Sequence, residues 1–135
     1  MDKLGITKVA FGCSSVDYLR ERIAARAVDG IHEITTRYRP TRHAELIGGS
    51  LYWIIKHRLV ARQTILGFVE MESEKRWIVR LDARLVPVRA RAKRAHQGWR
   101  YLEAENAPAD FDGDDAELAE LPPEILRELA ALALI

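Results

Sequence analysis

The feature that most constrains the fold is a nearly uninterrupted run of strand-like segments between residues 50 and 88, without a helical pattern between them. Each segment is short and rich in β-branched, aromatic or other apolar residues, which is typical of β-strands. The segments span residues 50–57, 62–70, 77–81 and 85–88. Because strands and helices do not alternate here, the run argues against a doubly wound parallel fold.

Two further strands precede this run, over residues 4–11 and 31–38, and a short aromatic strand follows it over residues 98–102. Three helices are expected: residues 16–27, capped by Ser14 or Ser15; residues 41–47, opened by Thr41; and a final helix after Pro122. We expect Asp29-Gly30 to close the first helix. The pattern predicts an α+β fold, either a strongly bent mixed sheet or a small β-barrel, with two to three packed helices.

The length of 135 residues fits one domain of common size. We expect residues 1–105 to form the α+β core, residues 106–121 an acidic loop or linker, and residues 122–135 a helix that packs on the same domain. No apolar run approaches the ~20 residues that span a bilayer. The start of the chain lacks the layout of a signal peptide, and a single Cys13 excludes an internal disulfide framework. These features predict a cytoplasmic protein that does not enter a membrane.

Charge is divided unevenly along the chain. Residues 1–102 hold 20 Lys and Arg against 10 Asp and Glu, whereas residues 103–135 hold 10 acidic residues and one basic residue, Arg127. Such asymmetry indicates either a polyanionic partner or an acidic segment that covers the basic face of its own domain. The sequence leaves both alternatives open.

The most basic stretch runs from residue 89 to residue 101 and contains no acidic residue. Guanidinium groups pair with phosphate oxygens, and aromatic rings offer faces on which unpaired bases stack. The candidate nucleic-acid-binding residues here are Arg89, Arg91, Arg94, Gln97, Trp99, Arg100 and Tyr101. The alternative is a solvated loop in which Trp99 and Tyr101 point into the core.

Two other basic groups are candidates for further walls of one groove. Arg37, Arg39 and Arg42 flank Pro40, and Lys56, Arg58 and Arg62 surround one hairpin. The first group has an alternative role, since its arginines could pair with Glu33 and Glu45. If the groups converge, they form a continuous positive groove.

Residues for catalysis are few. The four histidines are well separated and one cysteine cannot build a thiolate zinc site, so we expect no metal and no cofactor. The best enzymatic hypothesis uses His96 as a general base, with Lys93 or Arg100 stabilising the charge on a phosphate; Cys13 is a weaker candidate nucleophile.

Three strings resemble those of a known family: Gly-Gly-Ser-Leu-Tyr-Trp at residues 48–53, Arg-Gln-Thr-Ile-Leu at 62–66, and Gln-Gly-Trp-Arg-Tyr-Leu at 97–102. They are similar to the bacterial domain-of-unknown-function 1489 family, and the similarity runs from Leu4 to about Asp110. The chain departs from that pattern at His57, where Gly is usual, and at His96, where Phe is usual. The resemblance implies a small bacterial protein, with no established activity or cofactor.

A looser similarity concerns residues 37–69, where an Arg-rich strand end, a short helix, a Gly-Gly turn and a hairpin follow one another. This order resembles the PUA-like barrels, including the ASC-1-homology modules, and implies RNA or modified-nucleotide binding. The leading hypothesis, which rests on the basic residues interleaved with aromatic ones, is an RNA- or single-strand-binding module. One alternative is a small enzyme acting on a nucleotide-like or phosphorylated substrate in the same cleft. The other is an interaction protein that dimerises through its last helix.

Overall fold

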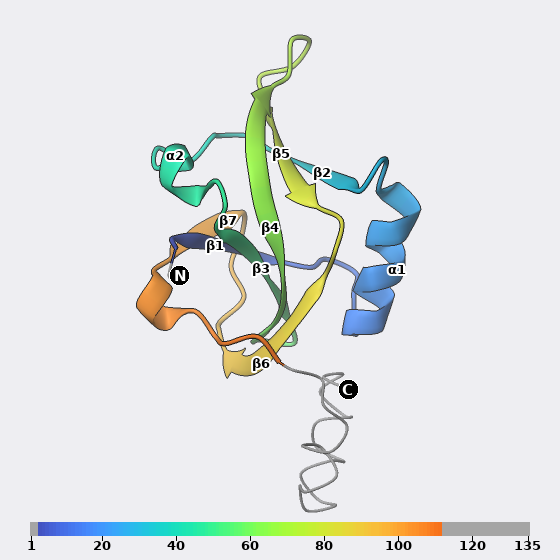
Figure 1. The fold of residues 1–135 in the computed structure, drawn as a ribbon, viewed down its shortest axis with the longest axis vertical. Helices are drawn as coiled ribbons and strands as arrows, with labels where there is room; N and C mark the ends of the chain where they lie inside the picture. Colours follow the sequence, from blue (N-terminus) through green and yellow to red (C-terminus); the bar gives the residue numbers. More distant parts are fainter. Residues whose placement is uncertain (1–2, 112–135) are drawn as a thin grey trace, which may run out of the picture.

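The computed structural model describes residues 3–111, which form one mixed sheet with two α-helices (Figure 1). The strands are β1 (Gly5–Val9), β2 (Ile31–Thr36), β3 (Ser50–Ile55), β4 (Arg58–Glu70), β5 (Trp77–Asp82), β6 (Val86–Ala92) and β7 (Trp99–Leu102). The helices are α1 (Val16–Arg26), α2 (His43–Leu46) and the 3-10 helix η1 (Ala104–Asn106). The expected helix over residues 122–135 lies outside the described residues.

The strand order is β2-β5-β4-β3-β1-β7, with β6 also paired to β4. Only β1 and β3 run parallel among the pairs in residues 3–111, so the predicted mixed sheet is confirmed. Across the described residues the two outer strands, β2 and β7, do not pair with each other, and the sheet stays open. The alternative of a closed barrel is therefore not supported.

Strand β4 organises the sheet because it is long enough to pair with three others. Its first part lies between β3 and β6, and residues 65–70 pair with β5. The pairing register shifts near Leu59–Ala61 and again between Ile65 and Gly67. Such irregularities bend and twist a strand locally.

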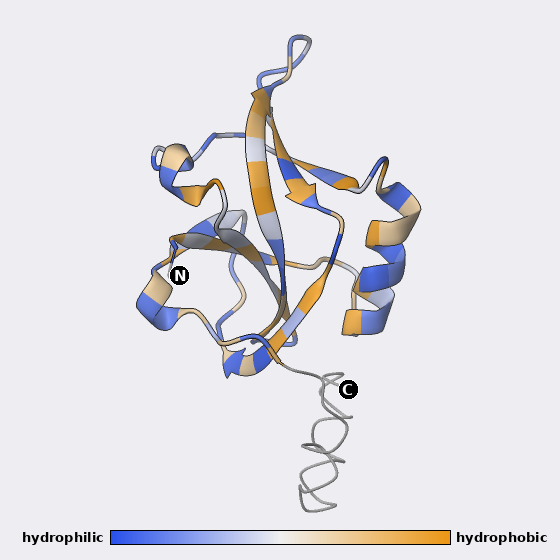
Figure 2. Ribbon diagram, in the orientation of Figure 1, coloured by the Kyte–Doolittle hydropathy of each residue, from blue (hydrophilic) through white to orange (hydrophobic). Residues whose placement is uncertain are grey.

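Both faces of β3 are buried, as the alternation of its side chains predicts. Leu51, Trp53 and Ile55 belong to the larger core, which also contains the buried residues of α1. Tyr52 and Ile54 face a smaller core on the other side. Figure 2 shows hydrophobic and hydrophilic residues interleaved along α1, which lies beside the sheet. The sheet thus has two covered faces, and the smaller core lies beneath the segment that follows β7.

Helix α1 begins as expected, because the Ser15 side chain accepts a hydrogen bond from the Tyr18 N–H at 3.1 Å. The predicted end of this helix is wrong. It stops at Arg26, and Asp29 and Gly30 form a two-residue turn with positive φ angles of 52° and 77°. Val28 and Ile31 exchange backbone hydrogen bonds across this turn, which makes it a tight reversal into β2.

The Gly48-Gly49 pair ends α2 and also permits a close approach. A Cβ atom on Gly49 would lie 2.2 Å from the carbonyl oxygen of Leu4. Thr41 is not the cap that the sequence predicted, since the N-cap residue is Arg42, without a side-chain cap. The first part of the predicted basic loop, residues 89–92, is instead strand, because Arg58 and Leu59 of β4 pair with Ala92 and Arg91.

Candidate functional site

The first basic group is divided between two places. Arg37 and Arg39 are exposed beyond the end of β2, and the Arg39 guanidinium lies 4.3 Å from the centre of the Trp77 ring. Arg42 instead faces β7, where its backbone N–H donates to the Tyr101 hydroxyl at 3.0 Å. The three arginines therefore do not form one wall of a groove.

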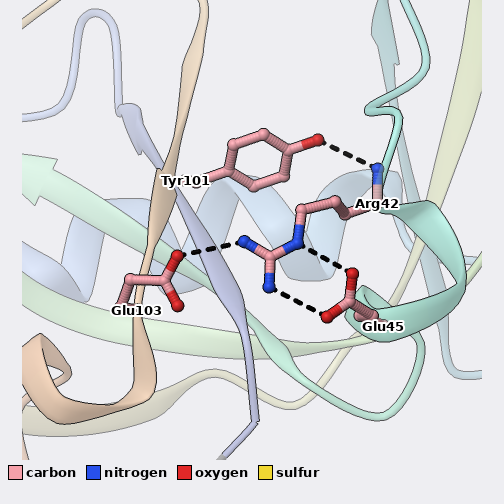
Figure 3. A network of polar contacts seen from close by, with 4 residues as sticks. All are labelled: Arg42, Glu45, Tyr101 and Glu103. Atoms are coloured by element: carbon pink, nitrogen blue, oxygen red, sulfur yellow. Dashed lines mark hydrogen bonds and ion pairs between the residues drawn. The ribbon is translucent and has the colours of Figure 1, made fainter.

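The charge of Arg42 is neutralised by two carboxylates (Figure 3). Its Nε and Nη2 donate to Glu45 at 2.7 and 2.9 Å, and its Nη1 donates to Glu103 at 3.0 Å. These hydrogen bonds raise the pKa of Arg42, and the bond from Arg42 lowers the pKa of Glu45. The predicted pairing with Glu45 is confirmed, whereas Glu33 pairs with Arg80.

Arg62, in the second basic group, also has an acidic partner. Its Nε and Nη2 donate to the two carboxylate oxygens of Asp110 at 2.7 and 2.8 Å, and its Nη1 donates to Ser50 Oγ at 3.2 Å. The hydrogen bond from Arg62 lowers the pKa of Asp110. A two-pronged contact of this kind is the strongest ordinary geometry for a guanidinium and a carboxylate.

Glu103 and Asp110 belong to one segment, residues 103–111, which we call the strap. The Arg89 N–H donates to the Ala109 carbonyl at 2.8 Å, and the Phe111 N–H donates to the Pro87 carbonyl at 2.9 Å, so the strap pairs with β6. Its Asn106 carbonyl accepts from Arg91 Nη1 at 2.8 Å. The strap therefore occupies three of the predicted binding residues, which are Arg42, Arg62 and Arg91.

Trp99 and Tyr101 share one face of β7, and that face is turned toward the larger core. Their rings meet edge to face, with centroids 5.0 Å apart and an interplanar angle of 74°. Both are partly buried, and the Tyr101 hydroxyl already accepts from Arg42. Neither ring is placed as an open stacking platform for bases, contrary to the leading hypothesis from the sequence.

The basic group around Lys56 does meet the basic stretch of residues 89–101. Lys56 and His57 form the turn between β3 and β4, with φ angles of 50° and 58°. The Lys93 N–H donates to the His57 carbonyl at 2.9 Å, and the Ala95 N–H lies 3.2 Å from His57 Nδ1. Lys56, Arg89, Arg94, Gln97 and Arg100 are all exposed. The β3–β4 turn that carries Lys56 thus lies against the loop that carries Lys93 and Ala95.

The centre of this region is His96. Its Nε2 lies 2.7 Å from the hydroxyl of Thr7, a fully buried residue of β1. Arg100 pairs directly with Thr7 across β1 and β7. Burial lowers the pKa of His96, and the charges of Arg100, Lys93 and Lys8 lower it further. We call His96 with Lys8, Lys93 and Arg100 the His96 cluster.

The cations of the His96 cluster lack acidic partners within residues 3–111. No hydrogen bond or ion pair joins the side chains of Lys8, Lys93 or Arg100 to a described carboxylate. Lys8 is partly buried, which lowers its pKa, and lies 5.9 Å from the centre of the Phe11 ring. The sequence singled out Arg100, but Lys8 and Thr7 were missed because they precede the loop by about ninety residues.

The enzymatic alternative stays a prediction. It predicts a deep pocket lined by Arg37, Lys56 and Arg100, with a titrating group such as His96 or Cys13 inside. Three hollows lie elsewhere, and neither His96 nor Cys13 lines any of them. In the part of the chain that the structure describes, no three His, Cys, Asp or Glu side chains are grouped to hold a metal ion. No helix among residues 3–111 has the length and apolarity needed to cross a bilayer.

The family model for "Protein of unknown function (DUF1489)" matches residues 6–135. The chain belongs to the DUF1489 family. This match confirms the resemblance carried by the three strings that include Trp53, Gln63 and Trp99. No curated protein and no solved structure matches this DUF1489 chain. The looser similarity to PUA-like barrels is accordingly not shown. The alternative of dimerisation concerns the last helix expected in this DUF1489 protein, residues 122–135, which lies outside the described residues.

Proposed function

We propose that this protein is a module that binds RNA or other single-stranded nucleic acid in the cytoplasm, with the His96 cluster as its phosphate contact. One observation carries the proposal. Arg100 pairs with Thr7, whose hydroxyl lies 2.7 Å from His96 Nε2; Lys8 is the next residue of β1, and Lys93 lies in the same loop as His96. Three cations gathered without a described counter-charge favour a polyanionic ligand.

The contrast with the other candidate residues supports this choice of site. Arg42, Arg62 and Arg91 have partners in the strap, so nucleic acid would have to displace those contacts. The exposed Arg94 and Arg100 have no such partner among residues 3–111. Phosphate contacts carry no sequence information by themselves, so binding through this cluster is expected to tolerate many sequences.

The proposal is tested by fluorescence anisotropy of the full chain with labelled single-stranded RNA, single-stranded DNA and duplex DNA across a salt series. Binding to a single strand releases counterions. Each phosphate contact therefore lowers the logarithm of the affinity by about 0.7 for every tenfold increase in salt concentration. Three contacts therefore predict a slope of about −2. Binding that is absent, or that does not change with salt, would contradict the proposal.

A further inference from the structure

The β4–β5 hairpin lies at the end of β4 farthest from β6 (Figure 1). A hollow of about 440 Å³ lies beside this hairpin. It is lined by Arg37, Tyr38, Glu70, Lys75, Arg76 and Trp77. The His96 cluster contributes none of these residues. The hollow combines aromatic rings, three cations and one carboxylate in a volume of the size that holds a small organic ligand.

Tyr38 supplies an aromatic ring that the fold leaves open. The residue is 70% exposed, which makes it the most exposed of the large hydrophobic residues among those described. It stands between Arg37 and Arg39 just after β2, and its carbonyl accepts from the Thr36 hydroxyl at 3.3 Å. An exposed aromatic ring with arginines on either side is suited to stacking on an unpaired base.

Trp77 forms a fixed wall of the same hollow. The Arg39 guanidinium lies 4.3 Å from the centre of its ring, so the arginine covers one part of the indole and adds positive charge beside the hollow. Trp77 pairs with Thr36 and Glu70 on the neighbouring strands, which holds its backbone in place. Strand pairing therefore holds the Trp77 side of the hollow in place, whereas the Tyr38 side chain is exposed to solvent.

Charge in the hollow matches a phosphorylated ligand. Arg37 and Lys75 make no ion pair with a residue in 3–111, and Arg76 lies at the long distance of 4.0 Å from Glu74. Glu70 is the acidic residue of the lining, and its carboxylate can accept from the amino or ring N–H groups of a base. The cations thus complement the phosphate of a nucleotide, and the open ring and the acceptor complement its base.

We infer that this hollow binds one unpaired nucleotide, with its base on Tyr38 and its phosphate at Arg37 and Lys75. The inference deepens the proposed function and rests on it, since it names the base contact that Trp99 and Tyr101 do not provide. The ligand is a nucleotide unit, taken either from a single strand or as a free nucleotide. The tests below distinguish these two sources.

The first test compares a single-stranded DNA with a strand of equal length whose sugars are abasic, so that phosphates are kept and bases removed. We expect the full chain to bind the base-bearing strand about tenfold more tightly. Tyr38→Ala should remove that difference without changing affinity for the abasic strand, and Tyr38→Phe should preserve it. Tyr18→Ala, which alters an exposed tyrosine of α1, is the matched control.

Equal binding of the two strands by the wild type, or no effect of Tyr38→Ala, would overturn the inference. Neither result would contradict the His96 cluster as the phosphate contact of the proposed function. Absence of binding to both strands would instead contradict the proposed function. In that case the protein is titrated with a free nucleoside monophosphate while its tryptophan fluorescence is followed. The Trp77→Phe variant then shows which part of the signal comes from Trp77. Saturable, Tyr38-dependent binding supports the hollow as a free-nucleotide site, and no binding overturns it.

Discussion

The hydroxyl of Thr7 lies 2.7 Å from Nε2 of His96 and joins a fully buried position of β1 to the loop between β6 and β7. The contact holds the loop over the sheet at the point where Arg100 crosses beside Thr7. Burial lowers the pKa of His96, the charges of Arg100, Lys93 and Lys8 lower it further, and the hydrogen bond with the Gln97 carbonyl acts in the opposite direction. The hydrogen bond between Thr7 and His96 therefore positions the His96 cluster.

Replacing Thr7 with Val keeps the shape of the side chain and removes its hydroxyl. We expect the free energy of unfolding to fall by about 1–2 kcal/mol, because a partly buried imidazole nitrogen loses its partner. Hydrogen exchange of the backbone amides in residues 93–98 should become faster, since the loop loses its attachment. Thr64→Val, which removes a partly exposed hydroxyl from β4, is the control. Unchanged exchange in the loop would contradict the positioning role.

Gln63 is the centre of a buried polar network in the larger core. It is fully buried, its Oε1 accepts from Trp53 Nε1 at 2.9 Å and lies 3.3 Å from His32 Nδ1, and its Nε2 donates to the Asp82 carbonyl at 2.9 Å. Gln63→Leu should lower the free energy of unfolding by about 3 kcal/mol, because several buried groups lose partners at once. Urea unfolding followed by tryptophan fluorescence measures this, and a loss below about 1 kcal/mol would show that the network adds little.

The free energy of unfolding should decrease as the pH is lowered below about 6.5, where an ordinary histidine begins to take up protons. Burial, and then the charges of Arg26 and Arg22, lower the pKa of His32, while its hydrogen bond with Gln63 acts in the opposite direction. Burial likewise lowers the pKa of His96. The unfolded chain thus binds more protons than the native one in this range, so the free energy of unfolding rises with pH.

Urea unfolding at several pH values between about 5 and 7.5 tests this direction. His32→Gln removes one of the titrating groups and should make the dependence shallower. A free energy of unfolding that increases as the pH falls through this range would contradict the assigned shifts.

Asp110→Asn should free Arg62 from the strap. The expected loss of stability is about 1 kcal/mol, as for other ion pairs near the surface. Affinity for single-stranded RNA should rise, because a guanidinium becomes available and a negative charge is removed. Glu105→Gln makes the same change of charge in the strap at a residue without an ion pair to a described residue, and is the matched control. Equal affinities of these two variants would argue against competition by the strap.

Local patterns predicted much of the fold. The alternation of Leu51 and Trp53 with Tyr52 and Ile54 correctly indicated a strand with two distinct faces. Ser15 was correctly predicted as a possible cap of α1. The turn at Asp29-Gly30 was misread because glycine with positive φ closes helices and forms tight reversals alike.

The site was harder to predict because its contacts are distant in sequence. Arg42 and Glu103 are 61 residues apart, and Arg62 and Asp110 are 48 apart. Charge asymmetry left open whether the acidic segment covers the basic face or a polyanionic partner binds there; in the structure the strap forms ion pairs with two of the arginines. Which arginines it covers, and the place of Arg100 beside Thr7 and its His96 contact, depend on strand pairing that no local pattern reveals.

The most direct test of the central claim is the salt dependence of single-stranded RNA binding by Lys8→Gln/Lys93→Gln/Arg100→Gln. Its control is Arg20→Gln/Arg26→Gln/Arg84→Gln, which removes three charges outside the His96 cluster, with circular dichroism to confirm that both variants fold. We predict that the cluster variant binds much more weakly and loses about two units of salt slope, whereas the control stays close to the wild type. Equal affinity and slope for the cluster variant and the wild type would contradict the His96 cluster as the phosphate contact.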